Sequence, residues 1–383
     1  MKSYIFQPGT TPQLSLVELT AVLGLKPTPL TESFVVADLA DDKSPTDCID
    51  QLGGTVKIYQ ELQVFPHDTS SETLKEAVIS VLIETAAGNK ISFSLSEIGR
   101  DHLEHISETE LKHDLRQAGV PSRYIEAPPG GLSAAVLLHR KNLIELSILQ
   151  TNDSIYLLKS VSVQNIDAWT VRDRGKPYAD RKKGMLPPKV ARMMLNINAQ
   201  YDTSENRLVY DPFCGTGTVL IENMSLGFKS LGSDIDEAAV RGARENMIWA
   251  AETLGADEVP QILLADVAHA VPTLPITAIV AEPFLGKPSP KPQQIENIFK
   301  GLEKLYLGGF RHWRSILPEG APITIIFPRS RVGKTVHSMT RLIDKLEELG
   351  YTTQSEPLVY ARSGAVIERE IYTFIYRNKH VTR

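Results

Sequence analysis

The strongest chemical signal in the sequence is the segment 209–219, which reads VYDPFCGTGTV. An apolar strand runs into a glycine-rich turn, and this turn opens a helix. Gly215 and Gly217 allow the backbone to approach a ligand closely, where any Cβ would clash. A dinucleotide fingerprint is incomplete, because Leu220 stands where its third glycine belongs, and the lysine of a P-loop is missing. The segment therefore predicts a nucleotide-like ligand that has no pyrophosphate.

Two acidic residues follow the next two predicted strands and suit the same kind of ligand. Asp234 comes 23 residues after Asp211, a distance at which an acid suits a pair of ribose hydroxyls. Asp266 ends the third strand, where its carboxylate can accept a hydrogen bond from an adenine amino group. A single acid at a strand end is more often part of a turn or a helix cap, and Asp236 is interpreted as such a cap. Three strand-end acids together with the glycine turn favour ligand binding.

A basic segment precedes the glycine turn. Residues 171–192 contain eight Lys and Arg against two Asp, whereas residues 1–170 contain 13 Lys and Arg against 22 Asp and Glu. Clustered positive charge attracts a polyanion, so the segment indicates contact with nucleic-acid phosphates, although a solvated linker has the same pattern. A pI near 6.0 disfavours strong non-specific binding of nucleic acid. The candidate phosphate-contacting residues are Arg172, Arg174, Arg181, Lys182 and Lys183.

The first half of the chain predicts mixed α+β structure without regular alternation. Short or alternating apolar runs predict strands at 4–6, 91–95, 134–138, 143–149 and 155–158. Helical periodicity covers 14–22 and 72–85, and Ser71 is the expected N-cap of the second helix.

The second half alternates strands with helices. Short apolar strands are predicted at 207–210, 230–233, 262–265, 277–280 and 323–327. Helical patterns lie between most of them, and this alternation predicts an α/β fold with a doubly wound, mostly parallel sheet. Such sheets bind ligands at the carboxyl ends of their strands, where Asp211, Asp234 and Asp266 stand.

These motifs resemble those of class I S-adenosylmethionine-dependent methyltransferases, whose domain is Rossmann-like. A narrower resemblance is to RNA methyltransferases with a THUMP domain, and among them to those that act on N2 of a guanosine in tRNA. It rests on LGGTVK at 52–57, RDRGKP at 172–177, GMLPPKVA at 184–191, DPFCGTGT at 211–218, YARSG at 360–364 and REI at 369–371. The resemblance implies a ferredoxin-like and THUMP-like RNA-binding region at 1–165, a basic linker and cofactor-loop helix at 166–200, and a methyltransferase domain at 201–383.

The resemblance also implies how S-adenosylmethionine would bind. The residues that it assigns to the cofactor are Asp211, Phe213, Gly215, Gly217, Asp234, Asp266, Met185 and Leu186. Asp211 would lie near the methionine part, Asp234 would bind the ribose and Asp266 the adenine. Met185 and Leu186 belong to a loop that would close over the methionine end.

A fourth motif, IVAEPFLG at 279–286, departs from the family pattern of Asp or Asn, then Pro-Pro, then Tyr or Phe. Either Glu282 replaces the acid and Phe284 the second proline, or Pro283 and Phe284 match Pro-aromatic and Ala281 stands at the acid position. The acid would hold the N–H groups of guanine N2, and the aromatic ring would stack on the base. Glu is one methylene longer than Asp, and a misplacement of ~1 Å can cost on the order of 10²-fold in rate. The candidate catalytic residues are Glu282, Pro283 and Phe284.

Other functions remain compatible with the sequence. They are a DNA or protein methyltransferase of the same fold, an RNA-binding protein that keeps cofactor affinity without transfer, and a Rossmann oxidoreductase, which the missing third glycine disfavours. The expected partner is tRNA or another structured RNA, and some members of the resembled family need a small activating protein subunit.

The composition excludes several classes of protein. Hydrophobic residues make up 42% and charged residues 23%, which excludes a disordered, fibrous or coiled-coil chain. No apolar run approaches the ~18 residues of a membrane-spanning helix, and the N-terminus is not a secretory signal. Cys48 and Cys214 form neither a disulfide framework nor a zinc motif, so we expect a cytoplasmic protein without a metal. Cys214 is expected to pack in the glycine turn and not to act as a nucleophile.

Overall fold

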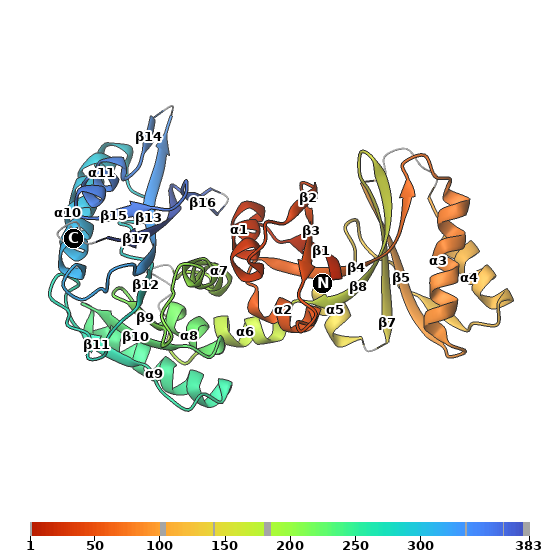
Figure 1. Ribbon diagram of the computed structural model, residues 1–383, viewed down its shortest axis with the longest axis horizontal. Coiled ribbons are helices and arrows are strands. Elements are labelled where there is room, and N and C mark those ends of the chain that lie inside the picture. Colours follow the sequence, from red (N-terminus) through yellow and green to blue (C-terminus); the bar gives the residue numbers. More distant parts are fainter. Residues whose placement is uncertain are drawn as a thin grey trace. The chain divides into compact units, whose positions relative to one another are not determined.

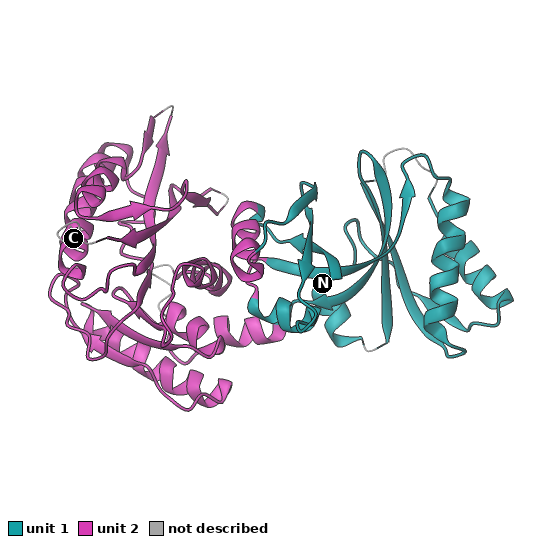
Figure 2. Ribbon diagram, in the orientation of Figure 1, with its two compact units in different colours: residues 1–12, 25–51, 55–166 teal, residues 13–24, 52–54, 167–383 magenta. Residues whose placement is uncertain are grey.

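The chain is divided into two compact units, which Figure 2 colours separately. The computed structural model describes residues 2–99, 105–140, 142–179, 185–333, 335–362 and 364–377. Unit 1 comprises residues 1–12, 25–51 and 55–166, and unit 2 comprises residues 13–24, 52–54 and 167–383. Two short segments from the N-terminal part of the sequence therefore belong to the unit that contains the glycine turn.

Unit 1 contains, among its described residues, an eight-stranded sheet with the order β2-β3-β1-β4-β8-β7-β5-β6 (Figure 1). The strands are β1 (Lys2–Pro8), β2 (Thr28–Thr31), β3 (Phe34–Leu39), β4 (Thr55–Pro66), β5 (Ile91–Ile98), β6 (Ser122–Tyr124), β7 (Leu143–Gln150) and β8 (Ser154–Val163). The helices are α2 (Pro45–Gln51), α3 (Ser71–Ala86), α4 (Glu108–Gln117) and α5 (Ala134–His139). Strand β4 pairs with both β1 and β8 and so joins the two halves of the sheet.

Strand β5 and helix α3 pack together because both have apolar residues at the right spacing. Ile91 and Phe93 alternate with polar residues along β5, and they share a core with Leu74, Val78 and Leu82 of α3. The strand predicted at 91–95 and the helix predicted at 72–85 are confirmed.

Two local predictions in unit 1 are wrong. The N-cap of α3 is Ser70 and not Ser71, because the Ser70 hydroxyl accepts a backbone N–H of the first turn. Residues 134–138 lie in helix α5 and not in a strand, and Ser133 caps this helix by accepting the Val136 N–H. The spacing of apolar residues does not distinguish a short buried strand from a short helix. Here the capping by Ser133 favours the helix.

Unit 2 contains, within the described part of the chain, a nine-stranded sheet with the main order β11-β10-β9-β12-β13-β17-β15. The strands are β9 (Leu208–Asp211), β10 (Lys229–Asp234), β11 (Gln261–Leu264), β12 (Ala278–Ala281), β13 (Pro322–Val332), β14 (Thr335–His337), β15 (Tyr351–Thr353), β16 (Leu358–Tyr360) and β17 (Ile367–Tyr376). The strands from β11 to β13 in this order are parallel, and β17 is antiparallel to β13. The predicted doubly wound, mostly parallel sheet is confirmed.

Helices cover both faces of this sheet (Figure 1). The described helices of unit 2 are α1 (Pro12–Leu23), α6 (Ile166–Arg174), α7 (Pro188–Ala199), α8 (Thr218–Ser225), α9 (Glu237–Leu254), α10 (Ile295–Trp313) and α11 (Thr340–Glu348), with a 3-10 turn at Pro292–Gln294. Successive side chains of β9 point to opposite faces, so Val209 shares a core with α7 whereas Tyr210 shares one with α10.

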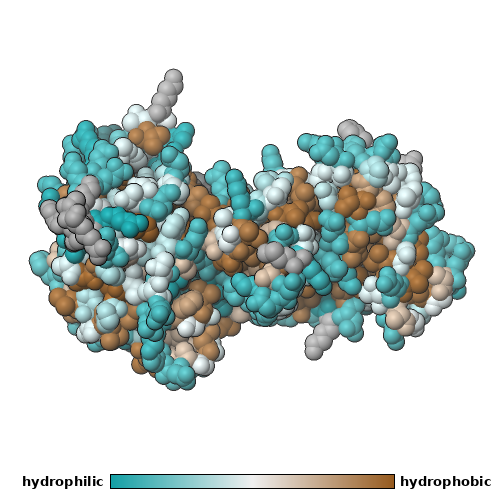
Figure 3. All heavy atoms as spheres, viewed as in Figure 1, coloured by the Kyte–Doolittle hydropathy of each residue, from teal (hydrophilic) through white to brown (hydrophobic). Residues whose placement is uncertain are grey.

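The surface of both units mixes hydrophilic and hydrophobic residues on the face drawn in Figure 3. None of the described helices is long and apolar enough to cross a membrane. The same residues contain no group of three or more His, Cys, Asp or Glu side chains that could hold a metal ion. Cys48 and Cys214 are both buried, and burial raises the pKa of Cys214 well above its ordinary value, which disfavours the reactive thiolate.

One buried carboxylate anchors α1 and the turn Leu52–Gly54 within unit 2. Glu18 Oε1 accepts the Gly53 N–H at 2.8 Å and Asn196 Nδ2 at 2.7 Å, while Oε2 accepts the Gly54 N–H at 2.8 Å. A Cβ at Gly53 would lie 2.4 Å from a backbone oxygen of α7, so this turn needs glycine. Burial raises the pKa of Glu18 to about 7, although all three hydrogen bonds oppose the shift.

The raised pKa of Glu18 predicts that unit 2 becomes less stable as the pH rises. The ordinary pKa is 4.5, so the contribution of the protonated group is complete below pH 4.5 and is lost as the pH rises through about 7. This shift corresponds to about 3 kcal/mol of unfolding free energy. Glu18→Gln does not titrate and should remove this pH dependence.

Urea unfolding of the two proteins at mildly acidic and mildly alkaline pH measures the effect. Tryptophan fluorescence reports on unit 2 alone, because Trp169, Trp249 and Trp313 all lie in it. A difference in stability between wild type and Glu18→Gln that stays constant with pH would contradict the prediction.

Candidate active site

The glycine turn joins the carboxyl end of β9 to the start of α8. Gly215 and Gly217 have φ angles of +51° and +88°, a region that other residues rarely adopt. A Cβ at Gly217 would also lie 2.7 Å from Cε of Met247, whereas a Cβ at Gly215 would meet no atom within 4 Å. The turn is therefore closed toward α9 at Gly217 and open at Gly215, where a ligand can approach the backbone.

Asp234, the last residue of β10, is bound to this turn. Its Oδ2 accepts the Gly215 N–H at 2.9 Å, and its Oδ1 accepts the Asp236 N–H at 2.9 Å. Asp236 in turn caps α9 by accepting two backbone N–H groups, as predicted. Each oxygen of a carboxylate has a second lone pair, so Asp234 can also accept hydrogen bonds from hydroxyl groups of a ligand.

Asp211, the last residue of β9, is buried. Its Oδ1 accepts the backbone N–H of Phe213 at 3.1 Å. Burial raises the pKa of Asp211 well above its ordinary value, and the negative charges of Asp234 and Glu282 raise it further. A positive group brought close to Asp211 would oppose this rise in its pKa, so the site favours a cationic ligand group.

The carboxyl ends of β10 and β11 expose two apolar side chains that the sequence analysis missed. Ile235 is 70% exposed and Leu264 is 54% exposed. They lie at adjacent strand ends, because Asp234 is the ladder partner of Leu264. Asp266 lies two residues beyond β11, is exposed and accepts the Ala268 N–H at 2.8 Å. Ile235, Leu264 and Asp266 together suit a flat ring with a polar edge. The sequence could have indicated Ile235, because this apolar residue directly follows Asp234, the acid at the end of a strand.

Glu282 is the acid that the carboxyl end of β12 presents. Ala281, the alternative position for the acid, is the last residue of β12 and is fully buried. Glu282 Oε1 accepts Nε of Arg369 at 2.5 Å, and both side chains are 14% exposed. Burial raises the pKa of Glu282, while the charges of Arg369 and Arg362 oppose this shift. The sequence analysis included Arg369 only in the motif at 369–371 and gave it no role in the site, since it lies on β17, far along the chain.

Phe284 projects outward from the segment after β12. Its side chain is 63% exposed, whereas the preceding Pro283 is buried. The hydroxyl of Tyr306, on α10, donates to the Phe284 carbonyl oxygen at 2.6 Å. This bond fixes the backbone at Phe284, so the ring stands beside Glu282 as a surface on which a base can stack.

Met185 and Leu186 have different surroundings. Met185 lies beside the glycine turn, because its sulfur accepts the Thr216 hydroxyl at 3.8 Å, and its carbonyl oxygen accepts Arg362 at 3.5 Å. Leu186 is buried in a core with Val190 of α7. Helix α7 begins at Pro188, and the contact of the preceding loop with a cofactor stays a prediction.

The basic segment is divided in the structure, and Arg172 faces the interior, contrary to the predicted phosphate contact. Its Nε donates to Glu222 Oε1 at 2.7 Å, and its guanidinium lies 4.3 Å from the ring centroid of Trp169. Arg192 Nη2 donates to the other oxygen of Glu222 at 2.8 Å. Arg174 is exposed and remains a candidate for phosphate contact. Arg181, Lys182 and Lys183, together with the motif residues Gly184 and Ser363, lie outside the described residues.

Asn246, on α9, connects the glycine turn to the segment 175–179, and sequence patterns did not indicate this connection. Its Nδ2 donates to the carbonyl oxygens of Thr216 at 2.8 Å and Tyr178 at 2.9 Å, and its Oδ1 accepts the Tyr178 N–H at 2.9 Å. The ring of Tyr178 lies against Gly242, where a Cβ would come within 2.1 Å of the ring. Asn246 is fully buried, so it holds both backbone segments in one geometry.

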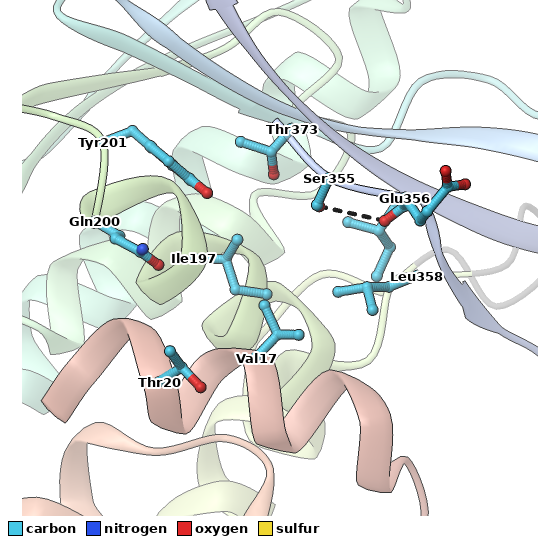
Figure 4. A pocket seen from close by; sticks show the side chains of 10 residues that line it. Val17, Thr20, Ile197, Gln200, Tyr201, Ser355, Glu356, Leu358 and Thr373 are labelled. Carbon is cyan, nitrogen blue, oxygen red and sulfur yellow. Dashed lines mark hydrogen bonds between the residues drawn. The ribbon is translucent and has the colours of Figure 1, made fainter. Parts of the chain in front are cut away.

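A pocket of 340 Å³ lies in unit 2 and is drawn in Figure 4. Its lining residues are Val17, Thr20, Ile197, Gln200, Tyr201, Ser355, Glu356, Leu358, Ile371 and Thr373. None of the predicted site residues lines this pocket. The candidate active site is instead the set of groups at the carboxyl ends of β9, β10, β11 and β12.

Comparisons with known proteins match parts of the chain to methyltransferases. A family described as an RMKL-like methyltransferase domain (UPF0020) matches residues 177–305. The chain is 34% identical over 144 residues to the tRNA (guanine(10)-N2)-dimethyltransferase of Pyrococcus abyssi, which is 35% of this chain and 41% of that protein. It is 27% identical over 243 residues to the protein of the same name from Methanothermobacter thermautotrophicus, which is 62% of this chain and 65% of that protein. Both matches cover less than two thirds of the relative.

The solved structure of TrmN from Thermus thermophilus matches this chain with a TM-score of 0.57 and 18% identity, over 98% of this chain and 99% of that chain. The fold is that of a class I methyltransferase. In this methyltransferase fold the carboxyl edge of the parallel strands is the ligand-binding edge, and the glycine turn and the strand-end acids all lie on it.

Proposed function

We propose that the chain is an S-adenosylmethionine-dependent methyltransferase that modifies the N2 amino group of a guanosine in tRNA. The observation that carries the proposal is the meeting of an open glycine turn with the carboxyl groups of Asp211, Asp234 and Glu282 at one edge of the sheet. The names of the two archaeal relatives, and the methyltransferase domain matched at 177–305, support the same activity.

The residues at this edge fit S-adenosylmethionine. Asp234 has lone pairs for the ribose hydroxyls, and Ile235 and Leu264 offer apolar surface to the adenine. Asp266 would accept a hydrogen bond from the adenine amino group, and the buried Asp211 would lie near the positively charged methionine part. Bound there, the cofactor supplies an activated methyl group on a positively charged sulfur.

Glu282 and Phe284 would hold the target base. The exposed ring of Phe284 offers a stacking surface to a guanine that has been flipped out of its helix. Because Glu282 Oε1 is bonded to Arg369, Oε2 is the oxygen that accepts an N–H of the amino group. This bond orients the nitrogen toward the methyl group, and Oε2 then takes the proton that the nitrogen gives up.

Unit 1 is proposed to be a THUMP-like module that binds structured RNA by shape and phosphate contacts. The resemblance at 52–57 and the mixed α+β architecture support this role. Arg174, a described residue of unit 2, would also contact phosphate. Residues 52–54 of the motif at 52–57 belong to unit 2.

Asn246→Ala is expected to raise the Kd of S-adenosylhomocysteine roughly tenfold. The variant loses three hydrogen bonds, each worth about 1 kcal/mol, and frees the glycine turn that the ligand must meet. Calorimetric titration measures the Kd, and Glu245→Ala, an exposed neighbour on α9, is the matched control. The idea fails if Asn246→Ala binds as tightly as the control.

Transfer of a labelled methyl group from S-adenosylmethionine to an unmodified tRNA transcript tests the proposed function. A transcript with inosine in place of guanosine lacks the N2 amino group and should take up no label. Nucleoside digestion of the guanosine transcript should yield N2-methylated guanosine. Label in the inosine transcript would place the target on another atom, and label in DNA would indicate another substrate class. Failure to bind S-adenosylmethionine would overturn the interpretation of the glycine turn.

A further inference from the structure

We propose that Arg369 is a positioning residue, which holds the Glu282 carboxylate by one oxygen and leaves the other oxygen for the amino group of the target base. The inference rests on the proposed function, because it assigns a role within the same site. Arg369 lies on β17 and not at any of the strand ends where the proposed ligand-binding residues lie.

The geometry of the contact is specific. Arg369 is the ladder partner of Pro328 on β13, and β13 separates β17 from β12 in the sheet order. The Arg369 side chain therefore reaches across one strand to Glu282, where its Nε donates to Oε1 at 2.5 Å. On its other side, its guanidinium lies 5.9 Å from the ring centroid of Tyr360, its ladder partner on β16.

The contact decides which oxygen of Glu282 is available. Oε1 accepts from Arg369, and the described residues place no hydrogen-bond donor on Oε2. A carboxylate held in this way offers one directed acceptor in place of two equivalent ones. Such an acceptor orients one N–H of an amino group and defines the direction of the nitrogen lone pair.

The charge of Glu282 also depends on Arg369. The charged groups that act on Glu282 are Arg369 on β17 and Arg362 after β16. The charge of Glu282 in turn raises the pKa of Asp211, at the end of β9, and of Tyr306, on α10. Burial raises the pKa of Glu282, and Arg369 is the larger of the two positive charges that oppose this shift. Without Arg369 the carboxyl group would hold its proton to higher pH. A protonated group is a weaker acceptor for the N–H and cannot take up the released proton.

The first test is the pH profile of methyl transfer by Arg369→Met, Arg369→Lys and the control Arg329→Met. Arg329 also joins β13 to β17, through Glu368 at 3.6 Å and Glu370 at 3.7 Å, but does not touch Glu282. Arg369→Met should lower kcat on the order of 10²-fold near neutral pH, with little change in the KM for S-adenosylmethionine. The acid limb of its profile should move to higher pH, so that raising the pH restores part of the activity. Arg369→Lys should retain more activity than Arg369→Met.

A pH-independent loss in Arg369→Met, or the same loss in Arg329→Met, would overturn the proposal, because a merely structural role predicts either result. A second measurement does not depend on activity. Carbon-13 NMR of labelled glutamate carboxyl groups, with the Glu282 signal assigned through Glu282→Gln, follows the titration of Glu282 directly. Its midpoint should rise in Arg369→Met and stay unchanged in Arg329→Met. An unchanged midpoint in Arg369→Met refutes the role of Arg369 even if the chain transfers no methyl group to tRNA.

Discussion

Glu282→Gln is expected to lower the rate of methyl transfer by on the order of 10²–10⁴-fold while leaving cofactor affinity nearly unchanged. The amide cannot take the proton that the nitrogen gives up, and it does not carry the charge that pairs with Arg369. Single-turnover transfer at saturating S-adenosylmethionine measures the rate, and calorimetry measures the affinity.

Two further variants sharpen this test. Glu368→Gln removes an acid on β17 that pairs with Arg329 on β13, and the transfer rate of this variant should match that of the wild type. Glu282→Asp withdraws the carboxylate by ~1 Å, which is enough to cost on the order of 10²-fold if Arg369 sets its position. A Glu282→Gln variant that transfers methyl groups as fast as Glu368→Gln would remove Glu282 from the mechanism.

Glu222→Gln is expected to destabilise unit 2 by about 3–5 kcal/mol, because breaking a buried ion pair leaves charge without a partner. Glu222 is fully buried on α8 and accepts from Arg172 of α6 at 2.7 Å and from Arg192 of α7 at 2.8 Å. The variant leaves two guanidinium groups in the interior with one neutral amide between them. Urea unfolding followed by tryptophan fluorescence measures the loss in unit 2.

The matched control is Glu258→Gln. Glu258 pairs with Lys229 at 2.8 Å on the surface of the same unit. Because water screens an exposed pair, this change should alter the unfolding free energy by no more than about 1 kcal/mol. If Glu222→Gln cost no more than the control, the three helices would not depend on the shared carboxylate.

The ion pairs of Glu222 also bear on the basic segment 171–192, for which the sequence allowed two interpretations, contact with phosphates and a solvated linker. Arg172 and Arg174 lie two residues apart in the basic segment and have the same side chain and charge, so neither composition nor charge distinguishes them. One of them neutralises Glu222 in the interior, and the other is exposed. The roles of Arg172 and Arg174 differ only because α8 places the buried carboxylate of Glu222 opposite Arg172.

The local structure of the site could be predicted because it depends on neighbours in the sequence. The glycine turn at Gly215 and Gly217, the acids at the ends of β9 and β10 and the cap at Asp236 follow from strand length, backbone freedom and side-chain capping. The same local rules failed at 134–138, where a short apolar run is compatible with either a strand or a helix.

The sequence by itself determined the alternation of strands and helices in the second half of the chain, the glycine turn and the acids that follow the strands, since each of these is encoded within a few residues. The tertiary structure alone decided which distant groups meet. Arg369 reaches Glu282 across 87 residues of sequence because β13 lies between β12 and β17, and Asn246 meets Tyr178 across 68 residues because α9 packs beside the turn. Glu18 holds Gly53 and Gly54 within unit 2 through a buried carboxylate. Such pairings depend on sheet order and helix packing, which no local pattern of residues specifies.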